Sequence, residues 1–137
     1  MRILITTSLL LLTVGGLFCS AETVRHGEID IHYTAFPSTI IAAEAAQAHD
    51  IVRSENKIIV NVSIKQGDEP AKAQLAGEVI NLLEQVIKLN FTEVQEDSAI
   101  YYLATHISRP KDVLRFNLFV TPLDGKTFPI TFLRRYD

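Results

Sequence analysis

Apolar side chains occupy alternate positions in Ile58-Ile59-Val60-Asn61-Val62-Ser63-Ile64-Lys65. Ile58, Val60, Val62 and Ile64 fall on one face of an extended chain, and the other face is mixed. Successive side chains of a β-strand point to opposite faces of the sheet, so a period of two predicts a strand with one buried face.

Alternation of this kind recurs along most of the chain. The further runs that we interpret as strands are residues 29–35, 71–83, 87–94, 99–107, 114–120 and 128–132. Residues 99–107 are apolar on both faces, which is typical of a central strand covered twice. Gly77 indicates a bulge or a close backbone approach, the Asp-Gly pair within residues 123–126 predicts a hairpin turn, and Pro129 favours an edge strand.

One segment breaks the alternation. Residues 42–49 are rich in alanine, contain no β-branched residue and predict a two-turn helix. About seven strands with one short helical insert after the first strand favour an all-β, immunoglobulin-like two-sheet β-sandwich. The alternative is a helix packed on an antiparallel sheet, as in cystatin-like folds, and it has too few helical residues to support it.

The N-terminus is typical of a leader for export. Arg2 is followed by an uncharged apolar stretch that ends at Ala21, which predicts a secretory signal peptide over residues 1–21 that is cleaved before Glu22. Residues 22–137 then form a single domain. The alternatives are a retained membrane anchor and a lipid-modified Cys19, and Phe18 disfavours the second because lipid attachment requires a small residue before the cysteine.

Composition and motifs exclude several functions. Lys and Arg number 13 against 16 Asp and Glu, and this acidic balance argues against electrostatic capture of nucleic acid or of anionic lipid. Cys19, the single cysteine, leaves with the leader, so the exported chain has no thiol chemistry. No nucleophile motif is present, and the four histidines lack metal-ligand spacing. We therefore expect no enzyme, no catalytic residue, no cofactor and no metal, with His106 as ordinary strand surface.

Amphipathic aromatic residues beside arginine are enriched in binding surfaces. The residues of this kind that we select as candidate binding residues are His32, Tyr33, Arg53, Tyr101 and Tyr102. Tyr101 and Tyr102 are adjacent in a predicted strand, so they point to opposite faces and cannot both line one site.

Several segments resemble one known family. They include His32-Tyr33-Thr34-Ala35-Phe36, residues 45–48 and 51–54, and later Gly77-Glu78, residues 81–83, 99–104 and 114–116. In order and spacing they are similar to the exported proteobacterial family DUF4426, a domain of unknown function, although Ala43-Glu44 stands where the family has Pro-Glu. The resemblance implies a Gram-negative periplasmic protein with an immunoglobulin-like or related β-sandwich. It implies no activity, cofactor or catalytic residue.

These observations leave three functions open. The first is a non-enzymatic periplasmic domain that binds a protein or envelope component through loops or a sheet edge, and that meets the membrane only transiently through its leader. The second is a small-ligand binder with a pocket where the helical insert crosses the sheet near Arg53 and His32.

An apolar cavity under residues 42–55 would favour the small ligand, and a flat exposed edge strand would favour the protein partner. A hydrolase would require His32 or His106 beside a carboxylate in a cleft. The sequence leaves the oligomeric state open.

Overall fold

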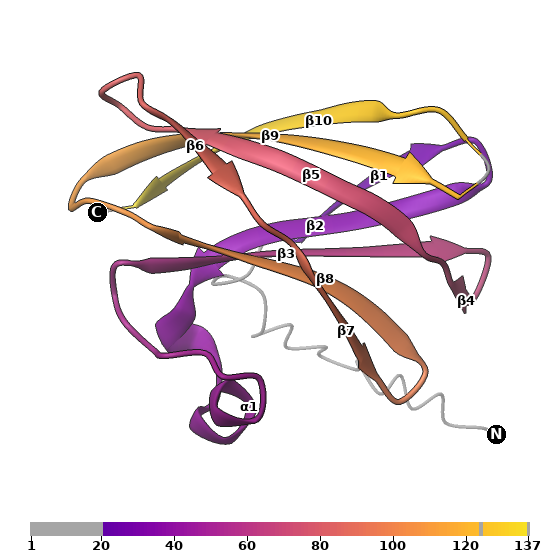
Figure 1. Ribbon diagram of the computed structural model, residues 1–137, viewed down its shortest axis with the longest axis horizontal. Coiled ribbons are helices and arrows are strands. Elements are labelled where there is room, and N and C mark those ends of the chain that lie inside the picture. Colours follow the sequence, from indigo (N-terminus) through magenta and orange to yellow (C-terminus); the bar gives the residue numbers. More distant parts are fainter. Residues whose placement is uncertain (1–20, 124, 137) are drawn as a thin grey trace, which may run out of the picture.

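The protein is a sandwich of two antiparallel sheets in a computed structural model that describes residues 21–123 and 125–136 (Figure 1). The leader expected over residues 1–21 lies, apart from Ala21, outside the described residues. The first sheet has the order β1-β2-β3-β8-β7, with β4 paired to β3, and the second has the order β10-β9-β5-β6. This arrangement confirms the all-β two-sheet sandwich.

Ten strands and two short helices build these layers. Their bounds are β1 (Glu22–His26), β2 (Ile29–Pro37), the 3-10 helix η1 (Ser38–Ile40), α1 (Ala43–Ala48), β3 (Lys57–Gln66), β4 (Glu69–Pro70), β5 (Ala73–Ile80), β6 (Val86–Leu89), β7 (Thr92–Glu96), β8 (Ala99–Ile107), β9 (Asp112–Pro122) and β10 (Phe128–Tyr136).

The alternating residues of the central strands form the core. Ile58, Val60, Val62 and Ile64 of β3 are at most 1% exposed. They belong to the same hydrophobic cluster as four fully buried residues of β9, namely Leu114, Phe116, Leu118 and Val120. Burial of a single aliphatic side chain of this size contributes about 1.5–3 kcal/mol, so the two strands supply much of the energy that joins the sheets.

Three expectations about the strands need correction. The described residues form ten strands rather than seven, and because β1 precedes β2 the helical insert follows the second strand. The run expected over residues 87–94 is two strands, of which β6 pairs with β5 in the second sheet and β7 pairs with β8 in the first. Alternation continues while the chain crosses between sheets at Asn90 and Phe91, and a period of two cannot reveal a change of hydrogen-bonding partner.

Gly77 confirms the close backbone approach. It lies in β5 opposite Leu89 and Leu118, and a Cβ built there would lie 3.0 Å from the carbonyl oxygen of Asn117 and 3.0 Å from Leu118 Cδ2. The Asn117 carbonyl is part of the sheet backbone and cannot move away cheaply. A residue with a side chain is therefore strained at this position.

We expect Gly77→Ala to lower the free energy of unfolding by about 1–3 kcal/mol, because the added methyl overpacks the second sheet. Urea denaturation measures the change. Gly125→Ala is the matched control, since its Cβ would meet nothing nearer than a Pro122 side-chain atom at 3.4 Å. Equal stability of the two variants would contradict the close approach.

His106 is buried, which corrects the expectation that it is ordinary surface. It is 6% exposed on the inward face of β8, on the same side as Tyr102 and Ala104. Loss of solvent lowers the pKa of His106 below its ordinary value of 6.5, and the Asp112 carboxylate partly opposes this shift. The folded protein therefore favours the neutral imidazole.

This burial predicts a pH-dependent stability. As the pH falls below the ordinary value of 6.5, the unfolded chain binds a proton that the folded chain resists, so the free energy of unfolding decreases until the folded pKa is passed. His106→Gln should remove this part of the pH dependence in urea titrations. The same substitution at the half-buried His32 should keep it, and an unchanged slope in His106→Gln would refute the assignment.

Candidate functional site

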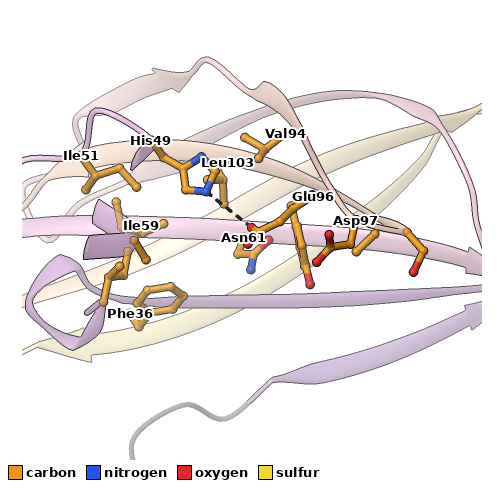
Figure 2. Close-up of a pocket in the computed structure, with 14 residues that line it drawn as sticks. Phe36, His49, Ile51, Ile59, Asn61, Val94, Glu96, Asp97 and Leu103 are labelled. Carbon is orange, nitrogen blue, oxygen red and sulfur yellow. Dashed lines mark ion pairs between the residues drawn. The ribbon is translucent and has the colours of Figure 1, made fainter. Parts of the chain in front are cut away.

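A groove lies between the outer face of the first sheet and the segment that joins β2 to β3. Its volume is about 530 Å³. We call it the insert groove, and Figure 2 shows its lining. The lining residues are Phe36, Ile41, Ala45, His49, Ile51, Ile59, Asn61, Val94, Glu96, Asp97, Ser98, Ala99, Tyr101 and Leu103.

The floor of the insert groove is a continuous strip of outward-facing side chains from adjacent strands. Phe36 of β2 pairs with Ile59 of β3, and Asn61 of β3 pairs with Leu103 of β8. Tyr101 of β8 pairs with Val94 of β7. Ile59 is fully buried although it faces away from the core. The insert therefore covers an apolar area that would otherwise meet water.

A clasp between Ser38 and Ser54 holds the two ends of the insert together. Ser38 is fully buried, and its Oγ donates a hydrogen bond to the Ser54 carbonyl and accepts one from the Ser54 N–H, both at 2.8 Å. Arg53 Nη2 donates to the Thr39 carbonyl at 2.9 Å. Between these points Ala46 of α1 is 2% exposed. The insert is thus a closed loop with a fixed base.

Ionisable groups gather at the β7–β8 end of the insert groove. His49 Nε2, just after α1, lies 3.5 Å from Glu96 Oε2 at the end of β7, and Figure 2 marks this contact as a dashed line. Asp97 follows with a φ of 54° in the β7–β8 turn. Such an exposed ion pair contributes little to stability. Its consequence is that two carboxylates and one imidazole lie beside an apolar floor.

Asn61 contributes an unusual atom to the floor. Its Oδ1 is buried, and it is a buried side-chain polar atom without a hydrogen-bond partner among residues 21–123 and 125–136. An unsatisfied buried acceptor costs about 1–3 kcal/mol of stability. A native structure that carries such a group calls for an explanation, and a ligand or water that donates to the oxygen would supply one.

Tyr33 and Tyr102, two of the candidate binding residues, are core residues. The Tyr33 hydroxyl donates to Glu22 Oε2 at 2.7 Å, and burial with this carboxylate raises the pKa of Tyr33 to about 12. The Tyr102 hydroxyl donates to Glu93 Oε1 and accepts from the Ala73 N–H, both at 3.0 Å. Both phenols are about 5–6% exposed and point between the sheets.

The other three candidates lie outside the core but do not form one site. Arg53 is exposed and supports the insert, as described above. His32 faces outward from β2, where its Nδ1 lies 2.8 Å from Thr23 Oγ1. His32 and Tyr101 both line a smaller hollow of about 400 Å³, and Tyr101 alone also lines the insert groove. Tyr101 and Tyr102 lie on opposite faces, as their adjacency requires.

Sequence reasoning missed Asn61, His49 and Glu96. One signal was available for Asn61, which shares the outward face of β3 with Ile59 and is the only amide in residues 58–65. No local pattern could bring His49 and Glu96 together, because 47 residues separate them and the contact depends on how the insert folds back.

The titratable groups in the lining of the insert groove are His49, Glu96 and Asp97, and neither His32 nor His106 is among them. His106 lies near Asp112, and both side chains are buried, at 6% and 5% exposure, away from the groove lining. Among the described residues, no three His, Cys, Asp or Glu side chains gather where a metal ion could bind. No described helix is long and apolar enough to cross a membrane.

Taken together, the fold and the groove define a small β-sandwich protein with a ligand-sized hollow between a helical insert and one sheet. The family model for the domain of unknown function DUF4426 matches residues 23–136. The chain belongs to this family.

Solved structures support the assignment. A DUF4426 family protein from Pseudomonas aeruginosa has a TM-score of 0.75 and 29% identity, over 84% of this chain and 93% of that one. FetP from uropathogenic Escherichia coli strain F11 has 10% identity. Its copper-bound variant gives a TM-score of 0.60 over 87% of this chain and 96% of that one. Its as-isolated form gives 0.59 over 87% and 95%. At this identity FetP shows the fold alone, and a comparison with curated proteins finds no match.

We expect Ser38→Ala to open the insert. The change removes both hydrogen bonds of the clasp and leaves the Ser54 N–H unpaired, so the free energy of unfolding should fall by about 1–3 kcal/mol. Limited proteolysis should then cut within residues 38–56 faster than in the wild type. The control is Ser63→Ala in β3. The Ser63 hydroxyl makes no hydrogen bond to the described residues. Equal cleavage rates would exclude the clasp.

Proposed function

We propose that this protein is an exported, non-enzymatic binding protein of the Gram-negative periplasm, and that it holds a small ligand in the insert groove. The ligand has an apolar body and at least one N–H or O–H donor. The observation that carries the proposal is the unpaired Asn61 Oδ1 in the apolar floor of the groove.

The size and lining of the insert groove support a small molecule. Ligand pockets in proteins have volumes of about 300–1,000 Å³ and combine apolar walls with a few polar groups. The groove has about 530 Å³, an apolar floor that includes Ile59 and Leu103, and one amide oxygen in that floor. This is the cavity under residues 42–55 that the sequence analysis named as the feature favouring a ligand over a protein partner.

The polar groups narrow the chemistry of the ligand. Asn61 Oδ1 is an acceptor, so the ligand must donate to it. Glu96 and Asp97 line the same groove, and carboxylates favour a positively charged donor over a negative one. We infer that an amine or another cationic N–H group joined to an apolar body fits better than a carboxylic acid or a phosphate.

The location rests on the leader and the family. Residues 1–21 have the composition of a signal peptide, and the family resemblance implies export. FetP, which shares the fold, was expressed recombinantly in the periplasm of E. coli, so the fold tolerates that compartment. The copper of the FetP variant belongs to that protein. We assign no metal, cofactor or catalytic residue to this chain.

Asn61→Leu should change binding and stability in opposite directions. The leucine removes an unsatisfied acceptor, so the free energy of unfolding should rise by about 1 kcal/mol in urea denaturation. The affinity for N-phenylnaphthylamine, an apolar fluorescent probe with one N–H donor, should fall about tenfold because its hydrogen bond is lost. A fluorescence titration of wild type and variant measures the second effect.

A matched pair on α1 shows where the probe binds. Ala45 lines the insert groove, so Ala45→Trp should fill it and abolish probe binding. Ala48 is exposed on the same helix outside the lining, so Ala48→Trp should bind as the wild type does. Probe affinity that is unchanged in both Asn61→Leu and Ala45→Trp would rule out the insert groove as the binding site.

A further inference from the structure

The hairpin loop between β5 and β6 presents apolar side chains to solvent. The loop covers residues 81–85 and projects from one end of the second sheet (Figure 1). Leu82 is 62% exposed and Leu83 is 60% exposed, and Val86, the first residue of β6, is 60% exposed. We call Leu82, Leu83 and Val86 the leucine tip. It shares no residue with the lining of the insert groove.

A buried polar network holds the leucine tip in one conformation. Asn81 Oδ1 accepts hydrogen bonds from the Leu83 N–H at 3.0 Å and the Gln85 N–H at 2.9 Å. Asp112 Oδ1, from the start of β9, accepts one from the Leu82 N–H at 3.0 Å. Asn81 and Asp112 are only 6% and 5% exposed.

Because of these hydrogen bonds, the leucine tip has a defined conformation and differs from a flexible loop. Two buried polar side chains fix the backbone of a turn whose leucine side chains are mostly exposed. Keeping two leucines in water forgoes about 1.5–3 kcal/mol each, so their fixed display points to a partner that buries them.

Exposed cations lie on the residues next to Asp112, whose carboxylate holds the leucine tip, and on the neighbouring strands. Arg109 and Lys111 lie in the turn that leads to Asp112, Arg135 of β10 pairs with Val113, and Arg115 Nη2 lies 3.9 Å from Glu84 Oε2 in the loop itself. The exposed carboxylates nearby are Glu84 and Glu55, and the Asp112 carboxylate is buried in the network. Among residues 21–123 and 125–136, four exposed cations thus stand against two exposed carboxylates at this end of the sandwich, in a chain whose overall charge is −3.

We propose that the leucine tip docks the protein on an anionic phospholipid surface, with Leu82 and Leu83 in the acyl boundary and the arginines and lysine against the phosphates. This differs from the expectation, based on the net charge and the leader, that anionic lipid does not capture the protein and that membrane contact occurs only through the leader. Aliphatic side chains flanked by Lys and Arg are the chemistry that binds a membrane interface, and each cation near such a surface adds about 1 kcal/mol. The tip has no aromatic residue and projects as a loop, whereas energetic centres of protein interfaces are rich in Trp and Tyr set in pockets.

Vesicle sedimentation tests the proposal on the exported chain, with its processed N-terminus checked by intact mass. We expect binding to vesicles of phosphatidylglycerol and phosphatidylethanolamine, weaker binding at high salt, and little binding to phosphatidylcholine alone. Leu82→Ser with Leu83→Ser should lower the partition coefficient at least about tenfold. Both hydrogen bonds from these residues are made by backbone N–H groups, so the double variant should keep the thermal unfolding profile of the wild type.

Two further variants separate the apolar contribution of the leucine tip from the electrostatic contribution of the cations to vesicle binding. Leu123→Ser changes a leucine that is 78% exposed in the β9–β10 turn, and it should bind vesicles as the wild type does. Arg109→Gln with Lys111→Gln should weaken binding about tenfold at low salt and flatten its salt dependence. The proposal is overturned if the wild type does not sediment with anionic vesicles, which would assign the tip to a protein partner. It is equally overturned if Leu82→Ser with Leu83→Ser binds no more weakly than Leu123→Ser.

Discussion

Strand β3 is buried along its inward face and also, at Ile59, on its outward face, and the arrangement of the neighbouring elements follows from that constraint. Its inward residues meet β9 across the sandwich, and its outward Ile59 is as fully buried as they are. The second sheet covers the inward face of β3. The outward face needs a separate cover, and the chain supplies it from the segment between β2 and β3, closed at its base by Ser38 and Ser54.

That cover is incomplete, and its incompleteness creates the insert groove. A six-residue helix cannot spread over the outward strip of four strands, so Phe36, Leu103 and Val94 line a hollow instead of a packed interface. Asn61 lines this hollow, and its buried Oδ1 has no hydrogen-bond partner among the described residues. Departures of this kind from the most stable packing are expected mainly at functional sites.

Much of the fold could be predicted from alternation, because inward residues such as Val60 and Phe116 must avoid water whatever their partners are. The position of Gly77 and the edge placement of Pro129 could also be predicted, since each is a local backbone requirement. The division of residues 86–96 between two sheets could not, because Asn90 and Phe91 continue the alternation while the pairing partner changes.

The candidate site was harder to predict than the fold. Tyr33 and Tyr102 are of a residue type that is common in binding surfaces, but both occupy positions of β2 and β8 that face the core. Their hydroxyls donate hydrogen bonds there to Glu22 and Glu93. His49 and Glu96 meet only because the insert folds back over β7. Residue type alone therefore could not distinguish these two buried tyrosines from Tyr101, which was selected on the same ground and lines the insert groove.

The central claim is that the insert groove accepts an apolar ligand with an N–H donor, and a nuclear magnetic resonance titration tests it most directly. Amide and side-chain spectra of the ¹⁵N-labelled exported chain would be followed as N-phenylnaphthylamine is added. The account predicts saturable shifts for the Asn61 side-chain amide and for Ala45, Ile59 and Leu103, with little change at the inward residues of β9. Shifts that spare Asn61 and its neighbours, or that gather at another part of the molecule, would contradict it.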